Sequence, residues 1–163
     1  MYVFAEERPD DWWEVEALYD LCFAPGREAL SSYRLRDGVA PISHLSRVAR
    51  DPEGVLAGAV RYWPVRVGDA AALLLGPIAV HPTRQGEGLG GALIQESLEA
   101  AEAATWDRVM LVGDLPYYRR FGFFGLSGLS LPGPTNPDRI LGRDLTKGAW
   151  HGIAGEVLSY AID

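Results

Sequence analysis

The stretch RQGEGLGG at residues 84–91 has the composition of a loop that binds phosphate groups. It lies between Pro82 and a run of helix-forming residues that begins at Leu89. Glycines leave backbone N–H groups uncovered, and the N–H groups that open a helix attract anions. These residue types therefore predict a site for a phosphate or a pyrophosphate, with a flexible turn that binds nothing as the alternative.

Two familiar phosphate-binding loops fit this stretch poorly. Gly86, Gly88 and Gly91 satisfy the G-x-G-x-x-G spacing of dinucleotide-binding folds, but residues 81–85 separate the first glycine from the preceding apolar run. In that fingerprint the first glycine follows the strand directly, and an acidic residue ends the next strand. Here Asp107 precedes the next apolar run instead. The P-loop is excluded as well, because no Lys-Ser or Lys-Thr follows the last glycine.

Length and composition limit the class of protein. The 163 residues, 48% of them hydrophobic, are enough for a sizeable core, and we expect a single domain over 1–163. A formal net charge of -7 argues against binding to nucleic acid or to anionic membranes. Cys22 is the only cysteine, which excludes an intramolecular disulfide and a Cys-rich zinc site, so we expect no metal. Without a signal peptide, and with its longest apolar stretch far below the ~20 residues that cross a bilayer, the chain is predicted to be cytoplasmic.

Hydrophobic periodicity and turn residues indicate an alternation of helices and strands. We expect helices at 12–23, 27–36, 89–104 and 115–121, and strands at 43–50, 55–68, 71–80, 108–112, 123–131, 139–145 and 155–162. The run at 71–80 is apolar on both faces, which is typical of the middle of a sheet. The crossover rule then makes it parallel to the strand at 108–112, with the long helix packed against the sheet.

With these elements in place, residues 75–94 resemble the acetyl-CoA-binding motif of the GCN5-related N-acetyltransferases, known as the GNAT superfamily. Its signature is Q/R-x-x-G-x-G/A at the start of a long helix, and Gln85, Gly88 and Gly90 fill the three positions. Tyr118, followed four residues later by Gly-Phe, resembles the second signature of the family. The stretches GPIAVHP and GDLPYYRRFGF further resemble the YhbS-like subgroup, and this likeness covers nearly the whole chain.

The resemblance implies an α/β (α+β) fold with a mixed, mostly antiparallel central sheet. Two parallel central strands splay apart in a V, and helices flank the sheet. The implied co-substrate is acetyl-CoA, with no metal. The backbone of Ile78, Ala79 and Val80 would pair with the pantetheine arm like an added strand. The pyrophosphate would bind at Gln85, Gly86, Glu87, Gly88, Leu89, Gly90 and Gly91. Glu87 stands where many relatives carry Lys or Arg, and we expect its carboxylate to point to solvent.

The implied activity is transfer of acetyl from acetyl-CoA to a primary amine of a small molecule or peptide. Tyr118 matches the general acid, since a phenol with a pKa near ~10 can protonate a thiolate whose conjugate acid has a pKa near ~8.5. Glu28 is our first choice for the base. His81 ends a strand and is expected to serve the turn, and Asp114 is expected to cap a helix. The alternatives are a water chain in place of one base, and a non-catalytic acyl-CoA-binding module in place of an enzyme.

The expected partners are thus acetyl-CoA and an amine acceptor, with no nucleic acid and no membrane. The sequence leaves the oligomeric state open, a homodimer included.

Overall fold

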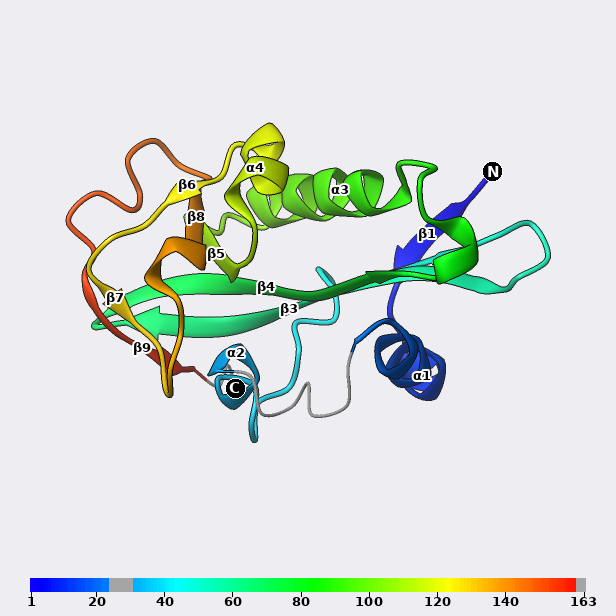
Figure 1. Cartoon of the computed structure of the whole chain (residues 1–163), viewed down its shortest axis with the longest axis horizontal. Coiled ribbons are helices and arrows are strands. Elements are labelled where there is room, and N and C mark those ends of the chain that lie inside the picture. The colour runs from blue at the N-terminus through cyan, green and yellow to red at the C-terminus, as the bar shows by residue number, and fades with distance from the viewer. Residues whose placement is uncertain (24–30, 161–163) are drawn as a thin grey trace.

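The computed structural model describes residues 1–23 and 31–160 as a central sheet with helices on both faces (Figure 1). The helices are α1 (Trp12–Cys22), α2 (Ser31–Arg34), α3 (Leu89–Ala103) and α4 (Leu115–Tyr118). The strands are β1 (Val3–Glu6), β2 (Arg47–Arg50), β3 (Leu56–Val67), β4 (Ala70–Val80), β5 (Arg108–Val112), β6 (Phe124–Gly125), β7 (Leu129–Ser130), β8 (Ile140–Asp144) and β9 (Gly155–Ser159). Short 3₁₀ turns cover Pro9–Asp11, Pro82–Arg84, Arg119–Phe121 and Pro137–Arg139.

The strands form a mixed sheet. In the described part of the chain, β1, β2, β3, β4, β5, β8 and β6 lie side by side in that order, and β9 pairs with β3 and β7. β4 runs parallel to β5 and β7 parallel to β9, while the other pairs are antiparallel. α3 packs on one face, against β2, β3 and β4, and α1 packs on the other, against β3 and β4 (Figure 1). The predicted fold class is therefore confirmed.

The two central strands part soon after they meet. β4 and β5 pair at Leu73 with Val109 and at Leu74 with Met110, and their pairing ends there. β4 continues to Val80 without β5 beside it. This divergence is the V-shaped opening expected between the parallel strands.

A β-bulge in β4 marks the point of divergence. Val60 of β3 faces Ile78 and Tyr62 faces Leu75, so Gly76 and Pro77 together lie opposite the single residue between them. A bulge bends its strand, and Gly76 adopts a φ of 130° that favours glycine. β4 thus turns away from β5 directly after their last paired residues.

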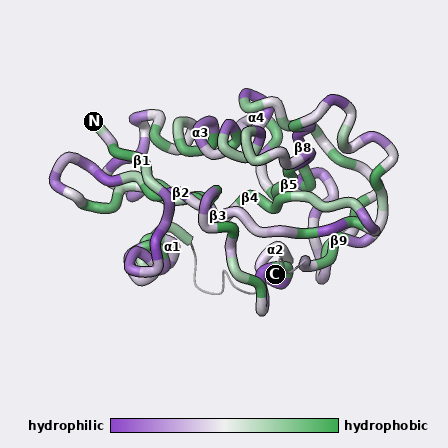
Figure 2. The backbone as a smooth tube through the Cα atoms, turned by 180° about the vertical axis from the view of Figure 1, so that it is seen from behind, coloured by the Kyte–Doolittle hydropathy of each residue, from purple (hydrophilic) through white to green (hydrophobic). Residues whose placement is uncertain are grey.

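The core fills both sides of the sheet. On α3 the buried positions recur with helical spacing and are Leu89, Leu93, Ile94, Ser97, Leu98 and Ala101. On α1 they are Val15, Leu18 and Tyr19. Figure 2 shows the hydrophobic residues of β4 and β5 between the helical layers. These two helices were predicted from the same spacing, and β5 has the predicted bounds.

Other predicted elements differ from the structure. The strand expected at 123–131 is two short strands, β6 and β7, and Gly128 between them has a φ of 81° that interrupts the extended backbone. The strand expected at 43–50 begins only at Arg47, after a turn. β1 was not predicted. The helix expected at 27–36 is described from Ser31 onward, and its first part lies outside the described residues.

Candidate functional site

A cavity of about 510 Å³ opens where β4 and β5 diverge. β4 and β5 supply two of its walls, and α2 and α4 close the others. The polar and aromatic side chains on its lining include Tyr33, Arg36, Asp114, Tyr117, Tyr118 and Arg139. The site is therefore a cavity between splayed strands, with tyrosine rings on both of the helices that line it.

Tyr118 at the end of α4 turns its ring into this cavity. The ring packs edge to face against Tyr117 at 5.0 Å and Phe123 at 5.8 Å between centroids. Burial raises the pKa of Tyr118 to about 12. Among the described residues no group hydrogen-bonds to its hydroxyl. The cavity therefore holds a neutral phenol whose proton is available to a bound molecule.

Gly113 makes room for this ring. A Cβ built on Gly113 would lie 2.6 Å from Cε2 of Tyr118 and 2.8 Å from Cδ1 of Leu111. Neither distance is tolerable for a real side chain. The absence of a side chain at the end of β5 thus fixes where the phenol lies.

Beyond Leu74, the edge of β4 that faces away from β3 is not paired with β5. The N–H of His81 donates to the carbonyl of Ala57 on β3 over 2.8 Å. Because main-chain groups alternate in direction along a strand, those of Val80 and Ile78 face away from β3, and those of Ala79 face toward it. The carbonyl of Val80 accepts from the side-chain amide of Gln85 at 3.2 Å.

The glycine loop follows this edge and opens α3. Gly86 and Gly88 have φ values of 86° and 79°, which glycine adopts without a side-chain clash, and Gly88 is the N-cap of the 15-residue α3. Farther along, a Cβ on Gly91 would lie 3.3 Å from Cζ of Phe121. The uncovered N–H groups and the positive end of the helix dipole make this turn a site for an anion.

One local and one long-range side-chain contact hold the loop. His81 Nδ1 accepts hydrogen bonds from the backbone N–H and from the hydroxyl of Thr83, so this histidine serves the turn as expected. Arg84 pairs with Asp51 at 2.6 Å. Two backbone N–H groups also bond to Asp51, and they are the main reason that its pKa lies below the usual range.

Glu87 is exposed, but its carboxylate does not point only to solvent. The hydroxyl of Tyr2, near the N-terminus, donates a hydrogen bond to Glu87 Oε1 over 2.6 Å. This bond is the largest cause of the raised pKa of Tyr2. The acidic residue of the loop is therefore turned toward Tyr2.

A second cavity, of about 310 Å³, adjoins the first. Tyr33, Arg36 and Pro77 line both cavities. The smaller one extends past α1 and β3, where Glu16, Asp37 and Arg61 are among its lining residues. Neither Tyr33 nor Arg36 was predicted as a site residue, although both lie in the segment expected to be a helix.

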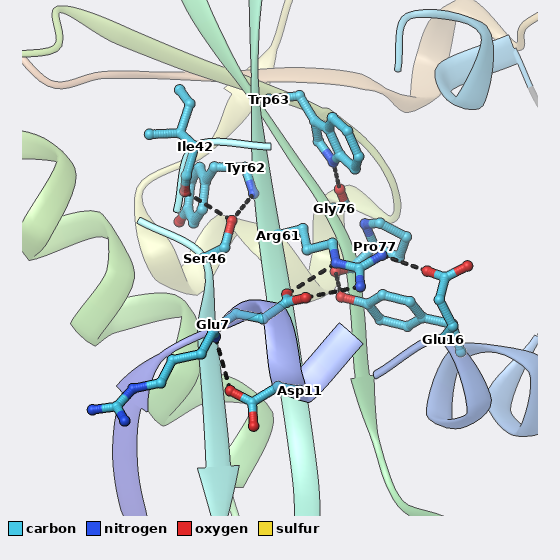
Figure 3. A network of polar contacts seen from close by, with 12 residues as sticks. Glu7, Asp11, Glu16, Ile42, Ser46, Arg61, Tyr62, Trp63, Gly76 and Pro77 are labelled. Atoms are coloured by element: carbon cyan, nitrogen blue, oxygen red, sulfur yellow. Dashed lines mark hydrogen bonds and ion pairs between the residues drawn. The ribbon is translucent and has the colours of Figure 1, made fainter. Parts of the chain in front are cut away.

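Buried polar contacts join α1 to this wall (Figure 3). Arg61 is 2% exposed and forms two hydrogen bonds with Glu7, at 3.0 and 2.9 Å, and an ion pair with Glu16. Its guanidinium also stacks on Trp12, 3.8 Å from the ring centroid. The positive charge of Arg61 is thus compensated by two carboxylates and by the ring of Trp12.

The bulge carbonyls are held by two aromatic side chains. The indole of Trp63 donates to the carbonyl of Gly76 at 2.7 Å (Figure 3). The hydroxyl of Tyr19 donates to the carbonyl of Pro77 at 2.8 Å. Side chains from β3 and α1 therefore fix the bend of β4.

The residues considered as the general base lie in different places. Glu28 lies outside the described residues. Asp114 occupies the N-cap position of α4, but its side chain makes no capping hydrogen bond and lines the larger cavity, so the expectation of a capping side chain is wrong. The two remaining histidines, His44 and His151, are also side chains that could accept a proton, but they are exposed and line neither cavity.

The described residues offer neither a metal cluster nor a membrane span. In residues 1–23 and 31–160, His, Cys, Asp and Glu side chains do not gather into a group of three that could hold a metal ion. None of the helices in these ranges has the length and apolarity needed to cross a bilayer.

The comparison with protein families decides which group this site belongs to. Residues 12–123 match the model of the acetyltransferase (GNAT) family. The chain belongs to the GNAT family. Its splayed strands and glycine turn are thus those of a GNAT protein, and the sequence resemblance is confirmed.

Relatives of this GNAT chain support the same assignment. It is 34% identical over 120 residues to an uncharacterized N-acetyltransferase, YhbS of Escherichia coli strain K12, with 72% of this chain and 70% of that protein covered. The crystal structure of Escherichia coli YhbS in complex with CoA superposes with a TM-score of 0.83 at 28% identity, over 98% and 89% of the two chains. A GNAT acetyltransferase from Brucella melitensis in complex with acetyl-CoA gives 0.64 at 32% identity, over 86% and 94%.

Proposed function

We propose that this GNAT protein transfers the acetyl group of acetyl-CoA to a primary amine of a small molecule or peptide. The observation that carries the proposal is the neutral hydroxyl of Tyr118 in the cavity between the splayed strands. We also propose that residues 1–163 form one acetyltransferase domain. Strands from near both ends of the chain, β1 and β9, belong to the same network of paired strands and support this.

The exposed edge of β4 is the proposed site of the pantetheine arm. Ile78 turns its N–H and C=O groups away from β3, and the arm pairs with them as an added strand would. Val80 offers its N–H group on the same side, because its carbonyl already accepts from Gln85 and from Cys22. Ala79 lies between them and directs its own main-chain groups to β3. Its side chain is buried in the cluster under α1, so its contribution is the spacing of its two neighbours.

The glycine turn is the proposed site of the pyrophosphate. The backbone N–H groups of residues 86–91 donate to it, and the dipole of α3 adds attraction for negative charge. Gln85 bonds to the end of β4 and fixes the turn relative to the pantetheine edge. The cofactor then runs from the turn into the cavity, with its thioester near Tyr118.

In the proposed reaction, a neutral amine nitrogen attacks the thioester carbonyl, a C–N bond forms and the C–S bond breaks. The departing thiolate takes a proton from the Tyr118 hydroxyl. With a pKa of about 12, Tyr118 remains protonated at neutral pH, but its proton is less acidic than that of a free phenol. Tyr118 therefore first donates a hydrogen bond to the thioester sulfur. It transfers its proton as negative charge develops on that sulfur.

The amine arrives as an ammonium ion and must lose a proton before it attacks. Glu28 stays our prediction for the base from the sequence resemblance. Within the described residues, Asp114 supplies a carboxylate on the wall of the larger cavity and can receive this proton directly or through water. The two carboxylates are distinguished by replacing each with its amide.

Release of CoA thiol from acetyl-CoA over a panel of amines tests the proposal. Tyr118→Phe should lower kcat by roughly 10²-fold or more, because the thiolate loses its proton donor. Tyr117→Phe removes a hydroxyl from the neighbouring ring and is the matched control. Unchanged turnover by Tyr118→Phe would remove Tyr118 from the mechanism. Stabilisation by acetyl-CoA without thiol release on any amine would support a non-catalytic acyl-CoA-binding module.

A further inference from the structure

Two aromatic side chains connect the start of α3 to α4 and the short turn after it. A Cβ built on Gly90 would lie 3.5 Å from the hydroxyl of Tyr117, and one on Gly91 would lie 3.3 Å from Cζ of Phe121. The two rings also pack against each other, with 5.5 Å between their centroids. Because neither glycine has a side chain, the rings approach the helix closely. α4 and the turn after it therefore contact the end of α3 that carries the glycine turn.

Arg120 stacks on the ring of Tyr117. Its guanidinium carbon is 4.7 Å from the ring centroid. Tyr117 lines the larger cavity, into which the cofactor is proposed to run from the glycine turn. Arg120 is exposed, and among the residues that the structure describes its side chain has neither an ion pair nor a hydrogen bond. The guanidinium is therefore one aromatic ring away from Gly90, and its N–H donors are available to a ligand.

The glycine turn has no cation of its own to offer a phosphate. Arg84 is the only basic residue in 84–91, all of them described, and it pairs with Asp51 at 2.6 Å. Glu87 adds a negative charge, and its carboxylate accepts a hydrogen bond from Tyr2. A pyrophosphate at this turn would thus meet backbone N–H groups and a nearby carboxylate. A cation from another segment would compensate for that carboxylate.

We propose that Arg120 donates hydrogen bonds to the pyrophosphate of the bound cofactor and supplies the positive charge that the glycine turn lacks. This inference rests on the proposed pyrophosphate site at the turn and adds to it a residue from a second segment. The ring of Tyr117 orients the guanidinium, since stacking leaves the N–H donors in the plane of the group free to bind an anion. Arg119 is exposed as well, but no ring among the described residues stacks on it.

Calorimetric titration of the protein with CoA tests the inference without any need for turnover. Arg120→Gln should raise the Kd for CoA by about fivefold to tenfold, because charge-assisted hydrogen bonds to the pyrophosphate are lost. The difference from wild type should shrink as the ionic strength rises, since salt screens an exposed cation. Arg120→Lys keeps the charge without the planar fork and should retain part of the affinity.

Arg119→Gln is the matched control, because it removes the same charge from the neighbouring exposed position. It should leave the Kd for CoA within about twofold of the wild-type value. Tyr117→Leu removes the ring under Arg120 and should lose part of the affinity, whereas Tyr117→Phe keeps the ring and should not. Thermal unfolding establishes that each variant is folded. A wild-type Kd in Arg120→Gln, or an equal rise of the Kd in Arg119→Gln, overturns the inference.

Dephospho-CoA, which lacks the 3′-phosphate, identifies the phosphate that Arg120 contacts. Contact with the pyrophosphate predicts that Arg120→Gln raises the Kd for CoA and for dephospho-CoA by the same factor. A rise seen with CoA alone would place Arg120 at the 3′-phosphate and would overturn the assignment to the pyrophosphate.

Gly88→Val separates this inference from the proposed function of the turn. The φ of Gly88 is 79°, which a β-branched residue rarely adopts, so the substitution should distort the turn and weaken CoA binding. Unchanged CoA binding by Gly88→Val would contradict the proposed turn site, whereas unchanged binding by Arg120→Gln alone overturns only the role of Arg120. A protein that binds CoA through Arg120 and acetylates no amine upholds the inference and contradicts the proposed transfer.

Discussion

The hydroxyl of Tyr2 donates a hydrogen bond to the carboxylate of Glu87 across 85 positions of sequence. This contact joins the segment before β1 to the glycine turn. Arg84 lies close to the same tyrosine, 5.9 Å from its ring centroid, and pairs with Asp51. The carboxylate in this glycine turn is thus bonded to a donor from a distant segment of the chain.

Tyr2→Phe should weaken CoA binding. Without the hydroxyl, Glu87 is free to approach the pyrophosphate and repel it, and we expect the Kd for CoA to rise by roughly threefold to tenfold at low salt. Calorimetry at low and high ionic strength measures the change, which salt should reduce. Tyr160→Phe is the control at another exposed tyrosine. In the double variant with Glu87→Gln the affinity should recover, and a loss that persists there would refute the repulsion.

Gly113→Ala should displace the Tyr118 ring. The new methyl group would lie 2.6 Å from Cε2 of Tyr118, and overpacking of this kind costs about 1–3 kcal/mol of stability. We expect kcat to fall as well, since the phenol no longer meets the thioester. Gly125→Ala is the control, because a Cβ there meets nothing within 4 Å. Equal effects of the two substitutions on kcat and on urea unfolding would contradict the packing argument.

The pH dependence of turnover should lack an alkaline limb from Tyr118 in the accessible range. Burial raises the pKa of this phenol to about 12 in the folded protein, from ~10 in a free phenol. Turnover should therefore rise as the amine deprotonates and show no fall between about pH 8 and 10. The raised pKa also contributes to the stability of the fold at any pH below the pKa that Tyr118 has in the unfolded chain. This contribution is lost as the pH rises through the pKa of Tyr118 in the folded protein. A fall near pH 9 that Tyr118→Phe removes would show that the pKa is not raised.

Glu7→Gln should destabilise the protein strongly. Its side chain is 5% exposed and that of Arg61 is 3% exposed, so the substitution leaves a buried guanidinium with less compensation. Removing one partner of a buried pair costs about 3–5 kcal/mol, and the remaining bond to Glu16 places our expectation near ~3 kcal/mol. Glu14→Gln breaks a more exposed pair with Arg50 and should cost less than ~1 kcal/mol. Chemical denaturation of both variants measures the difference, and similar midpoints would contradict the prediction.

Local patterns were enough to predict some elements. Apolar residues at helical spacing from Leu89 to Ala101 mark the buried face of α3, and the run at 108–112 is β5 without a change of bounds. Both signals arise within a few residues of chain, where periodicity follows burial directly. β1 gave no such signal, because its four residues form a largely exposed edge of the sheet and their stability comes from pairing with β2.

The site depends on contacts that no local pattern encodes. Glycine spacing indicated the anion-binding turn, and the motif around Tyr118 indicated the phenol. The bond from Tyr2 to Glu87 and the pair of Arg61 with Glu7 span 85 and 54 positions. Charge and hydropathy at either end do not identify such a partner. The positions of Tyr33 and Arg36 on the walls of two cavities were likewise not predicted, because cavities form only when distant segments meet.

The bend in β4 is fixed by contacts within the protein. Trp63 and Tyr19 hold the carbonyls of Gly76 and Pro77, and both aromatic residues are buried in the scaffold. A preorganised opening spares the entropy that ordering a loose strand would cost on binding. Amide hydrogen exchange around Gly76 should therefore be slow, and equally slow in the apo and the CoA-loaded protein. The cofactor then binds to a strand whose shape is already fixed.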